Sequence, residues 1–103
     1  MKPKRIEPLS QERLKEEVTY VINLLIKDTE LASLLAERQQ APDFTAEEGM
    51  MICVSGIAVE QALQDQINYI RDCGTSYEEF MSMFSLVRTE IALEAASPSK
   101  LAN

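Results

Sequence analysis

Apolar side chains recur along most of the chain at intervals of three and four residues, the period of an α-helix packed against a core. The first such stripe marks a predicted helix over residues 11–26: Leu14, Val18, Val21, Ile22 and Leu25. Ser10 precedes it and is a suitable N-cap. A shorter leucine stripe predicts a second helix over residues 29–39, with Asp28 or Thr29 as its cap.

The middle of the chain predicts a long helix over residues 46–73. Thr45 and Glu48 have the spacing of a capping box, and Gly74 is a usual left-handed helix stop. The first part of this segment, residues 49–59, is apolar on nearly every side, which is typical of a helix buried on most of its surface. We therefore expect this helix to lie at the centre of the fold.

A second capping box, Ser76 to Glu79, starts a predicted helix over residues 77–96. No segment shows the alternation of apolar and polar residues that marks a strand. The sequence thus predicts an all-α fold, a compact antiparallel bundle of three long helices plus one short helix, with the long central helix over about 46–73.

The predicted domain covers residues 10–97, between a flexible basic N-terminus (1–9) and a loose C-terminal tail (98–103). The longest apolar run, Met50 to Val59, is about half the length that a membrane span needs. No apolar stretch follows the basic start, as a secretory signal would require. We expect a cytoplasmic protein that does not insert into membranes.

The charge is strongly acidic and unevenly distributed. The 103 residues carry 10 Lys and Arg against 17 Asp and Glu, a net charge of −7. Three of the cations are Lys2, Lys4 and Arg5, so residues 6–103 carry a net charge of −10. Such a surface repels nucleic-acid phosphates and attracts a basic protein surface. We expect a protein partner and no direct contact with nucleic acid.

Candidate chemistry is sparse because the chain contains no His. This excludes His metal sites, His proton shuttles and His-activated nucleophiles within the chain. Cys53 and Cys73 have no ligand-like spacing and fall too far apart on one helix for a disulfide. We expect reduced thiols, with Cys53 as a small buried apolar residue. No catalytic residue, metal ligand or cofactor is predicted, and the protein is not expected to be an enzyme.

Residues 28–36 allow a different interpretation. Their Glu-Leu-Ala-Ser-Leu-Leu stretch resembles the first helix of helix-turn-helix repressors. That resemblance implies a DNA-binding regulator with a recognition helix next along the chain. No Lys or Arg occurs between Arg38 and Arg71, so the helix-turn-helix would be degenerate.

The function that the sequence favours is protein–protein binding, as an inhibitor, adaptor or regulator. Met is common on binding grooves, and acidic residues steer association with a basic partner. Where that basic surface binds nucleic acid, the chain would occlude it. The candidate contact residues are Met50, Met51, Met81, Phe84, Glu47, Glu48, Glu78 and Glu79. The long helix has more apolar surface than one short helix can cover, so a homodimer is also expected. The alternatives are the DNA-binding regulator and a structural homo-oligomer subunit.

Overall fold

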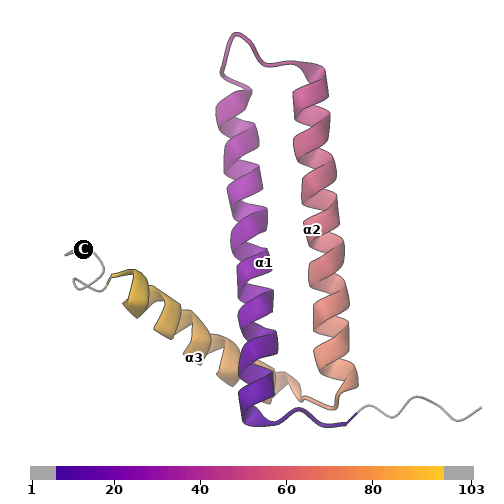
Figure 1. Cartoon of the computed structure of the whole chain (residues 1–103), viewed down its shortest axis with the longest axis vertical. Coiled ribbons are helices and arrows are strands. Elements are labelled where there is room, and N and C mark those ends of the chain that lie inside the picture. The colour runs from indigo at the N-terminus through magenta and orange to yellow at the C-terminus, as the bar shows by residue number, and fades with distance from the viewer. Residues whose placement is uncertain (1–6, 97–103) are drawn as a thin grey trace, which may run out of the picture.

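The computed structural model describes residues 7–96, which form three α-helices and no strand (Figure 1). These are α1 (Gln11–Arg38), α2 (Ala46–Asp72) and α3 (Tyr77–Ala95). The predicted all-α class is confirmed. The terminal segments 1–6 and 97–103 lie outside the described residues, and with them most of the predicted flexible N-terminus and all of the predicted C-terminal tail.

A single helix, α1, occupies the region where two helices were predicted. It runs for 28 residues from the predicted N-cap, where the Ser10 hydroxyl accepts from the Arg13 amide. The prediction of a separate short helix over residues 29–39 is wrong. Thr29 does not cap a new helix, because its hydroxyl donates to the Leu25 carbonyl inside α1. Nothing between residues 26 and 29 breaks a helix, and strong helix formers follow.

A turn over residues 39–45 leads into α2, which lies antiparallel beside α1 (Figure 1). The Thr45 hydroxyl accepts from the Glu48 amide, as predicted. The other half of that capping box does not form, because the Glu48 carboxylate binds the Arg38 guanidinium instead. Asp43 also pairs with Arg38, at 3.2 Å. One arginine at the end of α1 thus ties the turn to the start of α2.

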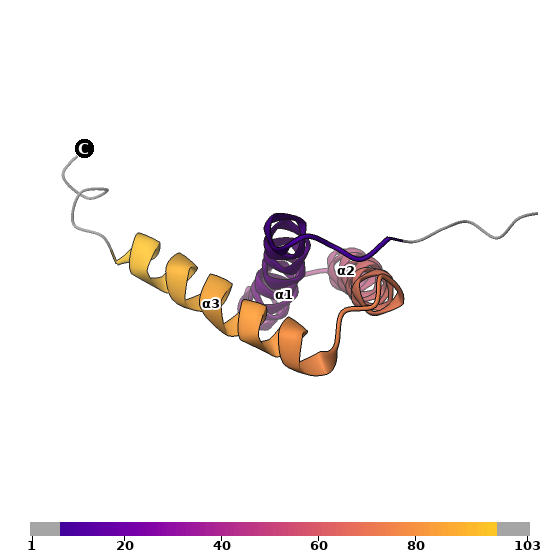
Figure 2. The same cartoon turned by 90° about the horizontal axis from the view of Figure 1, so that it is seen from below.

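Gly74 allows the chain to reverse after α2. Its φ is +92°, in the left-handed region that glycine adopts without strain. The complete capping box of Ser76 and Glu79 then starts α3, which crosses α1 near its first turns and points away from α2 (Figure 2). We call this end of the molecule the base, and the opposite end, with the turn 39–45, the tip. Only α1 and α2 form an antiparallel pair.

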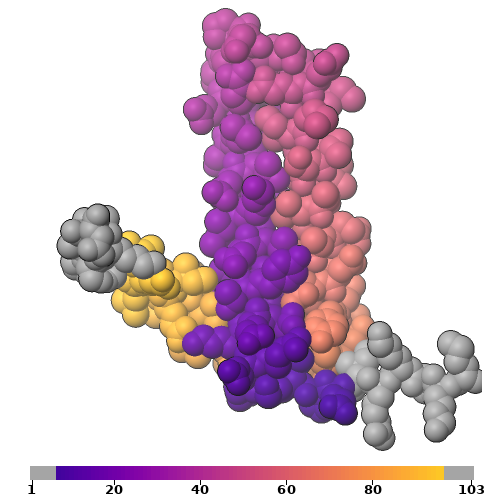
Figure 3. All heavy atoms as spheres, in the orientation of Figure 1, coloured from indigo at the N-terminus to yellow at the C-terminus, as the bar shows by residue number. Residues whose placement is uncertain are grey.

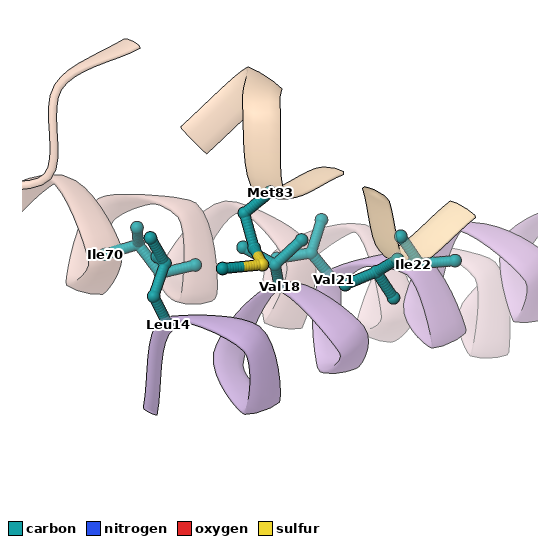
Figure 4. Close-up of a cluster of buried hydrophobic side chains, with 7 residues drawn as sticks. Leu14, Val18, Val21, Ile22, Ile70 and Met83 are labelled. Atoms are coloured by element: carbon teal, nitrogen blue, oxygen red, sulfur yellow. The ribbon is translucent and has the colours of Figure 1, made fainter. Parts of the chain in front are cut away.

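The core lies at the base, where all three helices meet. Its buried apolar side chains are mostly on α1 (Figure 4): Leu14, Val18, Val21, Ile22, Ile70, Met83 and Val87. Extensive packing joins α1 to both other helices. The prediction that helix 46–73 is central is therefore wrong, since α1 is central and Ile70 is the one buried residue of α2 itself.

The molecule is also less compact than predicted. Its radius of gyration is 17.8 Å, whereas a compact domain of this length has about 13 Å. The reason is visible in Figure 1: α3 does not run along the α1–α2 pair, so the tip consists of two helices without a third. Large parts of both helices there have only one neighbour.

Candidate protein-binding surfaces

The eight predicted contact residues do not form one surface. Glu47, Glu48, Met50 and Met51 lie in the first turns of α2, at the tip. The other four lie in the first turns of α3, at the base: Glu78, Glu79, Met81 and Phe84. Figure 1 shows that these two starts are at opposite ends of the molecule. The expectation of a single docking face therefore divides into two separate surfaces.

At the tip, four large apolar side chains of α2 point outward, and we call them the outer strip: Met50, Met51, Val54 and Ile57. Their exposed fractions lie between 62 and 69%. No described helix covers the side of α2 that faces away from α1 (Figures 1 and 2). Monomeric proteins rarely leave apolar groups contiguous and exposed to this degree unless the surface binds something.

The outer strip follows from the helical period. Ile52, Gly56 and Val59 turn toward α1 and are partly buried. At about 100° per residue, Val54 lies about 200° from Ile52, on the opposite side of the helix. Residues 49–59 thus carry apolar side chains on nearly every side of the helix, as the sequence indicates. The prediction that this segment is buried on most sides is wrong.

The cysteines lie on different parts of α2 and its cap, and both are free thiols. Cys53 is exposed, so its predicted burial is wrong, because it lines an open hollow of about 280 Å³ between α2 and the last part of α1. Cys73 is buried at the C-cap of α2. Its thiol forms a hydrogen bond with the Tyr69 hydroxyl, which raises the pKa of that tyrosine.

The carboxylates at the tip differ in their surroundings. Glu48 binds Arg38, with 3.0 Å from Nη2 to Oε1, and this hydrogen bond is the main reason that the pKa of Glu48 is lowered. The guanidinium pKa rises correspondingly, through Glu48 first and then Asp43. Glu47 is exposed in the first turn of α2, where the helix dipole favours a negative charge. Glu48 is therefore a structural ion-pair partner, and Glu47 remains open to an approaching molecule.

At the base, the predicted residues again serve different purposes. Phe84 is partly buried against the core and packs on Phe80, with ring centroids 5.9 Å apart. The Met81 side chain is about one-third exposed, at 36%. Glu79 closes the capping box of α3, and with Glu78 it lines a hollow of about 410 Å³ beside Met83 and Leu86. Only part of this set is free to contact a partner.

A more apolar groove lies between α1 and the C-terminal half of α3, and we call it the α1–α3 groove. It has a volume of about 430 Å³ and an almost entirely apolar lining. The apolar lining residues are Ile22, Leu25, Ile26, Phe84, Ile91 and Ala92. Glu30 and Arg88 stand on its rim. Figure 3 shows the angle that opens here between α3 and the upper part of α1.

Sequence reasoning found Phe84 of this groove but missed its other members as site residues. The available signal was Ile26, which falls off the main apolar face of α1 and makes that part of the helix apolar on two sides. Its 43% exposure shows that the second side is not covered. The pattern of α1 alone could not reveal the groove, because its other wall comes from a helix more than fifty residues later.

A polar network near the base also joins α1 to α2, and it is structural. The Gln66 amide on α2 donates to the Glu17 carboxylate on α1 at 2.6 Å and to the Glu17 carbonyl oxygen at 3.2 Å. Arg13 holds the other carboxylate oxygen at 2.6 Å. The bond from Gln66, followed by that from Arg13, lowers the pKa of Glu17. This arrangement fixes the register of α1 against α2 near the base.

Residues 7–96 contain no group of three or more His, Cys, Asp or Glu side chains placed to hold a metal ion. None of the three helices is both long and apolar enough to cross a membrane.

The segment that resembles a repressor helix forms the last part of α1. The next helix lies antiparallel to it, unlike the wide angle between the two helices of a helix-turn-helix.

Comparison with known proteins adds no further residue to these surfaces. No protein-family profile, curated protein or solved structure matches the chain.

Proposed function

We propose that this protein is a non-enzymatic binding protein, acting as an inhibitor, adaptor or regulator through docking of its helix faces on a partner protein. The α1–α3 groove carries this proposal. It combines an apolar floor with an open mouth between two helices that are fixed to each other by the core. Concave, preformed apolar sites of this kind are where binding energy concentrates in protein interfaces.

The partner that fits best presents an amphipathic helix with basic residues beside its apolar face. Apolar anchors of such a helix would fill the space beside Ile26, Phe84 and Ile91. All 17 acidic residues of the chain lie within residues 7–96, which contain only six of its Lys and Arg. This excess of negative charge attracts a basic partner over a distance and increases its association rate.

A basic partner surface suggests a specific biological use. Nucleic-acid-binding proteins carry clustered Lys and Arg, and an acidic protein bound there would compete with the phosphates. We propose this occlusion as the narrower form of the function. We also propose a cytoplasmic location, which the two free cysteines support because reducing compartments keep thiols unpaired.

A charge placed in the groove tests the proposal. Ala92 is exposed and lines the groove, so A92E adds a carboxylate there without disturbing the core. Leu93 is 68% exposed, lies about 100° round α3 from Ala92 and does not line the groove, which makes L93E the matched control. A photo-crosslinking residue at position 26 would identify the partner in cells by mass spectrometry.

We expect A92E to lose the crosslinked partner and L93E to keep it. We further expect the partner to be basic, and its affinity to fall between about 50 and 300 mM salt as charges are screened. An equal yield for the two variants, or a partner with an acidic contact surface, would overturn the proposal. A mobility shift of DNA at low salt would instead favour the DNA-binding alternative.

A further inference from the structure

We propose that the outer strip binds a second copy of this chain, with two α2 helices packed antiparallel around a twofold axis at Val54. The proposed function includes no surface for self-association, and this inference supplies one. It concerns the free side of α2 at the tip, whereas the partner of the proposed function binds between the middle of α1 and α3. The two proposals therefore rest on different side chains and fail independently.

The strip has the symmetry that such a pair requires. With the axis at Val54, each residue faces the partner residue whose number is the same distance from 54 in the other direction. Met50 then faces Ala58, and Met51 faces Ile57. Long flexible methionines thus meet a small alanine and a branched isoleucine, so that knobs of one helix fall beside gaps of the other. Isologous contacts of this kind close after two copies.

Charge is compatible with the pair in spite of the acidic chain. No charged residue lies between Glu48 and Glu60, so the centre of the contact is neutral. At its ends, Glu47 faces Gln61, whose amide can donate to a carboxylate and in the single chain donates to Asp65 at 2.9 Å. Glu48 and Glu60 lie to either side of this contact, each about 120° around the helix from Val54, and Glu48 binds Arg38 on α1.

These features also explain why a second copy fits this strip better than a basic partner. A basic helix needs carboxylates beside its apolar face, and the outer strip has none along its length between Glu48 and Glu60. Each Lys or Arg placed there would lose water without gaining a partner. Two identical neutral strips bury no charge.

The size of the contact sets the expected strength. Helix overlap would extend over residues 46–62 of each copy, about 25 Å at 1.5 Å per residue. A single pair of crossing helices of that length buries on the order of 1,000 Å² in total, at the lower limit of specific interfaces. We therefore expect a dimer that dissociates at micromolar concentration.

Sedimentation equilibrium of the full chain tests the dimer. The mass should rise from 11.6 kDa toward twice that value between about 1 and 500 μM protein. Because two acidic chains repel each other, added salt should strengthen the dimer, opposite to the salt effect on a basic partner.

V54E, at a position 62% exposed, should weaken the dimer by about 100-fold, with unchanged circular dichroism. L93E is the matched control at an equally exposed position on α3 and should dimerise normally.

Crosslinking tests the antiparallel register. In a C53S background, V54C should be joined to its twofold partner by a short bismaleimide, and Q64C should not, because position 64 lies beyond the overlap. A chain that stays at 11.6 kDa up to 500 μM overturns the proposal. So does a dimer that L93E disrupts as strongly as V54E, or one that Q64C crosslinks as well as V54C. A92E leaves this dimer intact and V54E leaves the partner crosslink intact, so failure of either proposal is recognised separately.

Discussion

The base and the tip are built from the same two helices, but they differ in how those helices bury apolar residues. At the base, α3 lies across α1, and Val18 is completely buried. At the tip, the segment from Met50 to Val59 is at least as apolar in sequence, yet Val54 is 62% exposed. The difference is the third helix. A helix with one neighbour buries one side, whatever the residues on its other sides are.

The largest effect that would test this difference comes from placing the same charge at both ends. V18D buries a carboxylate without a partner and should cost about 4 kcal/mol or more, enough to unfold much of a small domain. V54D should change the free energy of unfolding by less than about 1 kcal/mol. Urea denaturation at low micromolar protein measures both. If V54D is as damaging as V18D, the tip is not open in the monomer.

Truncation of two isoleucines of α2 should give a smaller contrast. Ile70 is 2% exposed and joins α2 to the core, so I70A should lose about 3 kcal/mol through lost burial and a cavity. Ile57 is 65% exposed, so I57A should lose less than about 0.5 kcal/mol under monomeric conditions. Thermal and urea unfolding check both values. Equal losses for the two variants would contradict the assignment of the core to the base.

The contact between α1 and α2 near the base should depend on pH. Q66A removes the hydrogen bonds to Glu17 and should cost about 1–2 kcal/mol at pH 7. Because the pKa of Glu17 is lowered by folding, its contribution is present above the ordinary glutamate pKa of about 4.3 and is lost as the pH falls through the lower folded value. The difference between wild type and Q66A should therefore shrink in acid, which urea titrations at pH 7, 5 and 3 would show. A pH-independent difference would mean that packing, and not the ionised carboxylate, is responsible.

The smallest expected effects concern two glycines at the tip. A Cβ at Gly56 meets no atom within 4 Å, so G56A should stabilise the protein by about 0.5–1 kcal/mol through helix propensity. A Cβ at Gly49 would lie 2.8 Å from the Phe44 ring, so G49A should gain less than G56A or lose stability. Thermal melts compare them directly. A larger gain for G49A would show that Phe44 does not pack there.

Local signals in the sequence were sufficient for the helix type and for most helix ends. Ser10, Thr45 and Ser76 cap their helices through side-chain oxygens, and Gly74 ends α2. These ends depend on hydrogen bonds within a few residues, which a sequence displays directly. The supposed break near Thr29 failed because a threonine can bond back inside a helix as well as cap one.

The arrangement of the helices could not be predicted in the same way. The apolar pattern of residues 49–59 shows that several sides can be buried but not how many neighbours are present. The direction of α3 is set at a four-residue connection, and it decides that α1 is central. The α1–α3 groove follows from that direction, so the sequence could not show that its lining residues lie together. The eight predicted contact residues are separated for a different reason: the starts of α2 and α3 lie at the two ends of α2.

The length of α1 has a further consequence. Its 28 residues extend for about 42 Å, with the dimer surface beside its last third and the α1–α3 groove beside its middle third. In the antiparallel dimer about Val54, the two α1 helices would lie on the outer sides, so the two grooves would be held at a fixed spacing across the twofold axis. A partner with two suitably spaced helices would gain avidity from such a bivalent scaffold, since its second contact becomes intramolecular. The rigid spacing would also discriminate between partners by the distance between their sites.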